Sequence, residues 1–211
     1  MSAPPVTSIR AALDDQAVLI VLAGPNGAGK STFFDQFLAS LGVPYVNADL
    51  IARVIREARP DTPPPEVDRQ AFRQAEELRR ALVEARVSFC TETVFSDPVG
   101  AKLGFIKDAR ARGFTVVLVF IGLESAELSI ARVMQRVREG GHDVPDAKLR
   151  ARYPRSLANL RAAIPLVDAA FVFDNSSYDA PYRAVAVYED GRLLTRQAPV
   201  PAWARRLPAL Y

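Results

Sequence analysis

One short run, residues 24–31, has the residue types and spacing needed to hold a triphosphate. It fits the phosphate-binding pattern G-x-x-x-x-G-K-[ST]. Glycines let the backbone curl so that successive N–H groups point at phosphate oxygens, and a helix starting there adds partial positive charge. In this pattern the lysine contacts the β- and γ-phosphates, and the final hydroxyl binds Mg²⁺. We therefore expect ATP and Mg²⁺ as cofactors, with Lys30 acting in catalysis and Ser31 as a metal ligand, in a nucleotide site made by Gly24, Asn26, Gly27, Ala28, Gly29, Lys30, Ser31 and Thr32.

Carboxylates follow two predicted strands, where the ligands of a parallel sheet bind. Asp49 ends the strand predicted at 45–49 and can accept the proton of an attacking hydroxyl, although an aspartate there is also a good helix N-cap. Glu92 lies among apolar residues, so it either holds substrate or Mg²⁺ or pairs with an arginine. We expect Asp49 to act in catalysis, and Glu92 and Thr93 to bind substrate.

The region of residues 132–160 holds the densest group of basic side chains and is predicted to be a helical lid. Most of its arginines should face solvent, but Arg136 and Arg152 are expected to offset charge on a transferred phosphoryl group. His142 is the only histidine, so it cannot form an ordinary metal site; a substrate phosphate contact and a loop hydrogen bond both remain open. Asn175 follows a late strand and is expected to contact adenine or to form a turn.

The elements that must position these residues follow from hydrophobic patterning. The continuously apolar run 17–23 suits a buried parallel strand. Spacing of three and four predicts an amphipathic helix over 66–85, with Glu76 and Arg79 on its solvated face. The alternation predicts a three-layer α/β/α fold with a mainly parallel sheet. The other strands are expected at 45–49, 87–93, 114–121 and 169–175, the other helices at 31–40, 50–58, 97–113, 124–138 and 146–163, and a hairpin at 182–196.

Composition limits the class of protein. The 211 residues suit one domain, with an N-terminal arm or short helix at 1–15 and a tail at 198–211 that packs on the core or meets a partner. The net charge is +3, but no nucleic-acid-binding motif accompanies it, so nucleic acid is not an expected partner. No run approaches the roughly 18 uncharged apolar residues of a membrane helix. The N-terminus lacks a signal-peptide pattern, and Cys90 is a lone cysteine expected to be buried; both observations favour the cytoplasm.

Taken together, these motifs resemble the zeta-toxin family of P-loop kinases. The resemblance covers roughly residues 16–177 and implies a P-loop kinase-like fold that phosphorylates a nucleotide-sugar hydroxyl, UDP-N-acetylglucosamine in the toxins proper. An antitoxin is then a possible partner. The resemblance assigns Lys30 and Ser31 to ATP and Mg²⁺, Asp49 to the general base, Glu92 to the substrate and Arg136 to the lid. It rests on the phosphate-binding run, 47–49, 91–93, the string from 132 to 157 with its Gly-Gly-His loop, and 174–176.

Three functions are compatible with these residues, in order of preference. The first is a magnesium–ATP kinase acting on a small hydroxylated, anionic molecule. The second keeps the chemistry but takes a polynucleotide 5′-hydroxyl as acceptor. The third is an ATP-binding regulator without catalysis, in which Lys30 matters and Asp49 does not.

Overall fold

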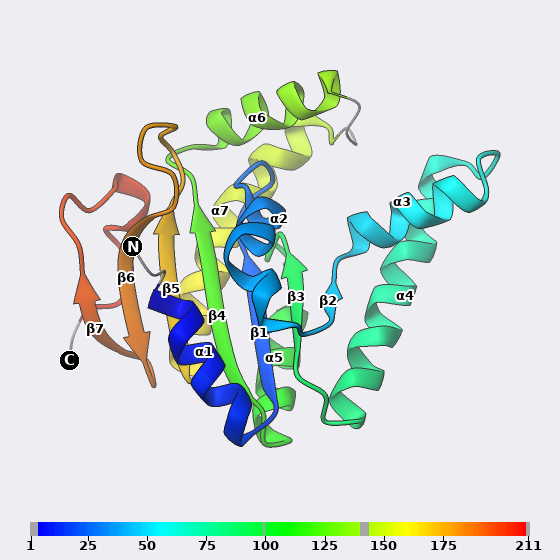
Figure 1. The fold of residues 1–211 in the computed structure, drawn as a ribbon. Coiled ribbons are helices and arrows are strands. Elements are labelled where there is room, and N and C mark those ends of the chain that lie inside the picture. The colour runs from blue at the N-terminus through cyan, green and yellow to red at the C-terminus, as the bar shows by residue number, and fades with distance from the viewer. Residues whose placement is uncertain (1–3, 99, 140–143, 210–211) are drawn as a thin grey trace.

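The computed structural model of the protein describes residues 4–98, 100–139 and 144–209. Within these residues, seven strands form one sheet in the order β2-β3-β1-β4-β5-β6-β7 (Figure 1). The first five strands in this order are parallel, and β6 and β7 continue the sheet in antiparallel pairing. The strands are β1 (Val18–Ala23), β2 (Tyr45–Val46), β3 (Phe89–Thr93), β4 (Thr115–Gly122), β5 (Ala169–Asp174), β6 (Arg183–Glu189) and β7 (Arg192–Arg196).

Helices cover both faces of this sheet, which confirms the predicted three-layer α/β/α class. Side chains alternate along the fully buried strand β1: Leu19 and Val21 join the core cluster on one face, and Ile20 and Leu22 join the cluster on the other. Helices α1 and α2 cover the second of these faces, and α4, α5 and α7 cover the first (Figure 1). The α-helices are α1 (Pro4–Asp15), α2 (Lys30–Phe33), α3 (Ala48–Ala58), α4 (Pro64–Glu84), α5 (Ala101–Ala111), α6 (Ala126–Arg138) and α7 (Asp146–Ala163), and a π-helix, η1 (Phe34–Leu38), and a 3-10 helix, η2 (Ala39–Leu41), continue α2.

The two ends of the described chain pack on this core. Of the two alternatives for the N-terminal arm, the helix is correct, and its Ile9 is fully buried. In the C-terminal tail, the indole Nε1 of Trp203 donates a hydrogen bond to Asp174 Oδ1 at 3.0 Å. The same ring lies against the backbone of Gly122 so closely that a Cβ there would be 2.2 Å from it. The tail therefore supports the ends of β4 and β5.

Two local expectations were wrong. Asp49 is not a helix N-cap: α3 begins at Ala48, and Asn47 is its cap, with Oδ1 accepting from the Asp49 N–H at 2.8 Å. Strand β2 correspondingly ends at Val46, before the aspartate.

The helix expected from residue 97 begins only at Ala101, after Gly100 as its N-cap. Tertiary contacts explain the difference, because α7 takes the backbone acceptors of the preceding segment. Ser156 donates to the carbonyl of Val94 at 2.8 Å, and Asn159 donates to the carbonyls of Phe95 at 3.0 Å and Asp97 at 3.2 Å. The bond to Asp97 occupies the carbonyl that a helix from residue 97 would use, and together the bonds hold residues 94–97 as a non-helical segment that lines the cleft.

Candidate active site

The phosphate-binding run forms a tight loop between β1 and α2. Gly24 follows the strand with φ 148°, and a Cβ on it would lie 2.2 Å from the carbonyl oxygen of Ile121, so only glycine fits. Gly29 has φ 85° and is the left-handed residue from which α2 starts. The loop thus has the glycine conformations and the helix N-terminus that a phosphate cradle requires.

Two side chains hold the outer backbone of this loop. Asn175 Nδ2 donates to the Ala28 carbonyl at 2.9 Å, and the Tyr182 hydroxyl donates to the Gly29 carbonyl at 2.9 Å. The N–H of Tyr182 in turn donates to Asn175 Oδ1 at 3.2 Å. Because these two carbonyls are bonded from outside, the loop keeps its curl. Asn175 is buried behind the loop in this arrangement, and a contact between Asn175 and adenine stays a prediction.

The carboxylate of Glu92 is the centre of a partly buried hydrogen-bond network beside the loop. Its Oε2 accepts hydrogen bonds from Ser31 Oγ at 2.9 Å, from Asn47 Nδ2 at 3.0 Å and from the Tyr45 hydroxyl. Its Oε1 lies 3.6 Å from Nζ of Lys30, which also donates to the Pro25 carbonyl at 3.1 Å. The ionic partner of Glu92 is therefore Lys30, whereas the sequence had suggested an arginine as the alternative to a site role.

Tyr45 is a member of this network that sequence reasoning missed. Its signal was strand alternation, because Tyr45 lies two residues before Asn47 and so points to the same side. Burial and the neighbouring Glu92 carboxylate raise the pKa of the Tyr45 hydroxyl well above its usual value. The phenol therefore stays protonated and donates to Glu92.

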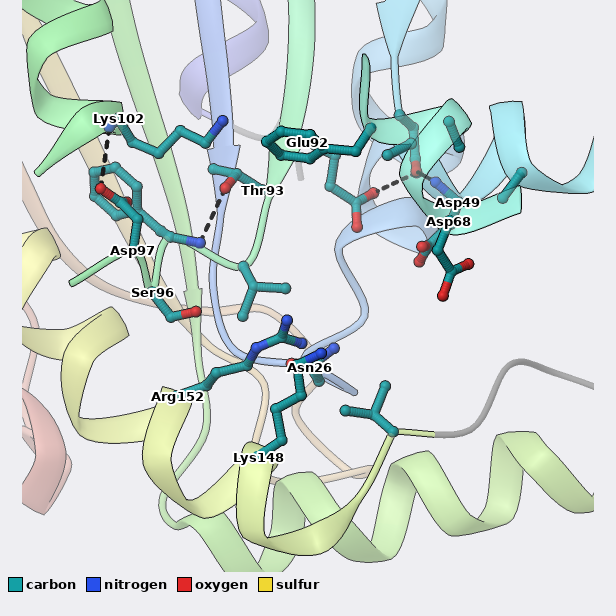
Figure 2. A pocket seen from close by; sticks show the side chains of 18 of the residues that line it. Asn26, Asp49, Asp68, Glu92, Thr93, Ser96, Asp97, Lys102, Lys148 and Arg152 are labelled. Atoms are coloured by element: carbon teal, nitrogen blue, oxygen red, sulfur yellow. Dashed lines mark hydrogen bonds between the residues drawn. The ribbon is translucent and has the colours of Figure 1, made fainter. Parts of the chain in front are cut away.

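A cleft of about 810 Å³ opens from this network, and six of the predicted site residues line it: Asn26, Asp49, Glu92, Thr93, Arg136 and Arg152. Asp49 and Thr93 line its wall, and so do Arg136 of α6 and Arg152 of α7. Figure 2 shows Arg152 and its neighbour Lys148 reaching from α7 toward the region where Glu92 and Asp49 lie. His142, which the sequence associated with substrate, lies outside the described residues.

Side chains of opposite charge, Asp49 on one element and Arg152 and Arg155 on another, line this cleft. Burial lowers the pKa of Arg152, the nearby Arg155 lowers it further, and the carboxylate of Asp49 acts in the opposite direction. Asp49 itself is exposed. Asp49, a group of cationic side chains and Asn26 of the phosphate loop thus line one cavity.

A second cluster of polar side chains, made by Arg79, Glu76 and Lys102, lies at the cleft, and the prediction for Arg79 was wrong. Arg79 was expected on a solvated face but is only 6% exposed, because it follows Ala75 and precedes Val83 at helical spacing. It donates to Thr91 Oγ1 at 3.2 Å and pairs with Glu76, which also pairs with Lys102 at 2.8 Å. Burial acts to raise the pKa of Glu76, but the bonds from Lys102 and Arg79 outweigh it and the pKa is lowered.

The residues beside the phosphate loop fit a magnesium ion. Ser31 Oγ and Glu92 Oε2 lie 2.9 Å apart, and both are oxygen donors of the kind Mg²⁺ prefers. Within the described ranges, no group of three or more His, Cys, Asp or Glu side chains could hold a metal ion. Protein sites for Mg²⁺ commonly use one or two carboxylates and complete the shell with substrate phosphates and water. Ser31 and Glu92 would form the protein part of such a site.

The sheet order, the flanking helices and the phosphate loop define a kinase fold of the P-loop, ATP-binding type. The most similar arrangements include an AvrRxo1-ORF1:-ORF2 complex with ATP, with a TM-score of 0.69, 17% identity and 92% of this chain covered. This chain spans 65% of the length of that chain. The PezAT toxin–antitoxin system of Streptococcus pneumoniae gives a TM-score of 0.62 and 16% identity, over 86% of this chain and 78% of that one.

Sequence comparison identifies the family. The zeta toxin family model matches residues 7–190, and the chain belongs to that family. An uncharacterized protein of Haemophilus influenzae is 30% identical over 136 residues, which are 64% of this chain and 91% of that protein. In the part of the chain that the structure describes, no helix is both long and apolar enough to cross a bilayer.

Proposed function

We propose that this protein is a magnesium-dependent kinase that transfers the γ-phosphate of ATP to a hydroxyl of a small molecule held in the 810 Å³ cleft. The observation that carries the proposal is that a single cleft is lined by Asn26 of the phosphate loop, by Asp49 and by Arg136 and Arg152. Phosphoryl transfer depends mainly on positioning and on charge stabilisation, and this cleft can supply both.

At the nucleotide, the loop amides and Lys30 bind phosphate oxygens. Lys30 has to exchange the Glu92 carboxylate, 3.6 Å away, for the β- and γ-phosphates. Ser31 and Glu92 would hold Mg²⁺, which neutralises charge on the phosphates when it is bound. Thr32, on the first turn of α2, would add its backbone N–H to these donors.

At the acceptor, Asp49 takes the proton of the attacking hydroxyl. The acceptor oxygen forms its bond to the γ-phosphorus while the bond from that phosphorus to the β,γ-bridging oxygen breaks, and ADP leaves. Arg136 and Arg152 offset the negative charge on the moving phosphoryl group. Glu92 and Thr93 line the cleft and would orient the acceptor.

The charge of the cleft suggests the class of acceptor. Its lid side is lined by four cationic side chains: Arg136, Lys148, Arg152 and Arg155. Such a group attracts an acceptor that carries its own phosphates. A nucleotide sugar such as UDP-N-acetylglucosamine meets that requirement and is the first acceptor to test. The volume lies within the usual range for small-molecule sites.

The test measures transfer from labelled ATP to a panel of acceptors: UDP-N-acetylglucosamine, other nucleotide sugars, sugar monophosphates and an oligonucleotide with a free 5′-hydroxyl. We expect transfer to a nucleotide sugar. We expect Asp49→Asn to lower the rate by about 10²–10⁴-fold while calorimetry still detects ATP binding. The control Lys30→Ala should lose both binding and transfer.

Each alternative has its own outcome in this experiment. Transfer to the oligonucleotide alone would establish the polynucleotide kinase instead. Binding of ATP by the wild type, with no transfer to any acceptor and no effect of Asp49→Asn, would favour the regulator. Absence of ATP binding would refute every nucleotide-dependent function.

We also propose a protein partner for this chain. PezAT is a toxin–antitoxin system, and the present chain has its fold over 86% of its length. We infer that an antitoxin neutralises this protein by covering the cleft. Expression in a bacterial host should then arrest growth, and Asp49→Asn should relieve the arrest; equal arrest by both proteins would count against it.

A further inference from the structure

A phenol hydroxyl supports the Glu92 carboxylate from outside the cleft. The Tyr45 hydroxyl donates to Glu92 Oε2 and itself accepts a hydrogen bond from Asn47 Nδ2 at 3.1 Å. Asn47 Nδ2 also donates to the same carboxylate oxygen at 3.0 Å. Asn47 and Glu92 are among the described residues that line the 810 Å³ cleft, whereas Tyr45 is not. Tyr45 is therefore placed to act on the site through these neighbours and not by touching a substrate.

The contacts of Glu92 are divided unequally between its two carboxylate oxygens. Ser31 Oγ, at 2.9 Å, adds a third donor to Oε2. Oε1 has Lys30 Nζ at 3.6 Å, which is an ion pair beyond hydrogen-bond distance. An ionised carboxylate has about two acceptor sites on each oxygen, so the three donors occupy Oε2 and leave the sites of Oε1 open. The carboxylate is thereby held in one orientation, with Oε1 toward Lys30.

Tyr45 is in turn held by an aromatic stack. Its ring lies flat on the ring of Phe34, with 3.7 Å between the centroids and 6° between the planes. Phe34 is buried and is the first residue of the π-helix η1. Such helices are rare and are frequently found at functional sites. Because η1 continues α2, the stack connects Tyr45 to the element that carries Lys30 and Ser31.

The three donors to Oε2 differ in what else they do. Ser31 Oγ would be a ligand of Mg²⁺. Asn47 is the N-cap of α3, and its Oδ1 accepts from the Asp49 N–H at 2.8 Å. Tyr45 has one hydroxyl hydrogen and donates it to Glu92. Tyr45 therefore remains to orient the carboxylate when Ser31 takes its second role.

We propose that Tyr45 is a positioning residue for the Mg²⁺ site: its hydroxyl fixes Glu92 so that Oε1 is open to Mg²⁺ once Lys30 has moved to the nucleotide. This inference rests on the proposed nucleotide-dependent function. A side chain that hydrogen-bonds to a metal ligand sets the orientation of that ligand, and its loss typically costs about 10–100-fold in metal affinity or activity. The Tyr45 hydroxyl has this relation to Glu92.

The experiment measures ATP binding to the full chain by calorimetry, once with excess Mg²⁺ and once with a chelator that removes it. Tyr45→Phe deletes the hydroxyl and keeps the ring on Phe34. We expect this variant to weaken ATP binding in the presence of Mg²⁺ about tenfold, the lower end for loss of one partner of a metal ligand. Binding of metal-free ATP should stay as in the wild type, because the phosphate loop itself is unchanged.

Two further variants sharpen the comparison. Phe34→Leu keeps an apolar side chain but removes the flat ring, so it should weaken binding with Mg²⁺ in the same direction and by less. Tyr188→Phe is the matched control: it deletes a hydroxyl that donates to the Pro208 carbonyl at 2.8 Å, and it should change neither constant. Thermal unfolding without ligand shows that each variant is folded.

Unchanged binding with Mg²⁺ in Tyr45→Phe would overturn the inference. An equal loss with and without Mg²⁺ would overturn it too, because the effect would then lie on the phosphate loop, and so would an equal loss in Tyr188→Phe. A wild type that binds ATP equally well with and without Mg²⁺ would remove the metal site but leave nucleotide binding. Binding of no ATP under either condition would remove the proposed function itself, which distinguishes this result from the others.

Discussion

Glu92→Gln is expected to lower the free energy of unfolding by about 3 kcal/mol, because it leaves a buried ammonium without its carboxylate. Lys30 is 6% exposed, the Glu92 side chain is 11% exposed, and their charged atoms are 3.6 Å apart. At that separation the attraction is about 5 kcal/mol for an effective dielectric constant of about 20, and desolvation of both groups offsets much of it. Removing one partner of such a pair typically costs about 3–5 kcal/mol. Glutamine still accepts a hydrogen bond from Tyr45 or Ser31, so we take the lower end.

Urea denaturation at neutral pH measures this loss. For a chain of this size, about 3 kcal/mol corresponds to a melting temperature lower by about 6–12 °C. The double variant Lys30→Met/Glu92→Gln removes both charges, so it should lose less stability than the two single variants added together. The matched control is Glu57→Gln, whose pair with Arg53 at 3.9 Å is exposed and should contribute less than about 0.5 kcal/mol.

The reasoning would be refuted if Glu92→Gln cost no more than Glu57→Gln. Strict additivity in the double-variant cycle would refute it as well, because it would mean that the two charges do not interact. Either result would remove the argument that Lys30 must exchange a carboxylate for phosphate on binding a nucleotide.

Two more predictions concern the supports around the site. The folded-state pKa of Glu76 is depressed, so its ionised form contributes stability that is present above the ordinary pKa and lost as pH falls through the folded value. Glu76→Gln should therefore cost about 1 kcal/mol at neutral pH and nothing below the folded pKa, as followed by urea denaturation across pH. Gly122→Ala should cost about 1–3 kcal/mol in thermal unfolding, because the new methyl would lie 2.2 Å from the ring of Trp203.

Each of these two predictions has a matched control variant. Glu77→Gln, at the following exposed position of α4, should stay within about 0.5 kcal/mol of the wild type. A Glu76→Gln loss that did not change with pH would contradict the ionic explanation. Gly104→Ala, inside α5 with nothing within 4 Å of the new Cβ, should stabilise by about 0.5–1 kcal/mol. Equal behaviour of the two glycine variants would mean that Trp203 does not pack as described.

Local sequence patterns were sufficient to predict most of the strands and helices. The apolar run before the phosphate loop forms the fully buried β1. The helix expected at 124–138 is present as α6, and the Ser125 hydroxyl caps it by accepting from the Leu128 N–H at 3.1 Å. The hairpin predicted at 182–196 is present as β6 and β7. These features depend on neighbouring residues, so a single sequence can specify them.

Contacts between distant segments could not be predicted in this way. Glu92 meets Ser31 across 61 positions and Tyr45 across 47, and nothing in either local pattern indicates the pairing. The segment before α5 has the composition of a helix start, yet Asn159 of α7 bonds its carbonyls and the helix begins later. In this segment, side-chain hydrogen bonds from α7 to the backbone override the local propensity to start a helix.

The sequence by itself determined the phosphate loop, because its glycine dihedrals and the strand and helix on either side are local properties. It also determined the parallel α/β class, which follows from alternating apolar runs. Only the tertiary structure decided that Asp49, Glu92 and Arg152 line one cleft, since they lie on α3, β3 and α7. Packing of the helices on the sheet sets the distances between these groups, and those distances depend on every buried side chain between them.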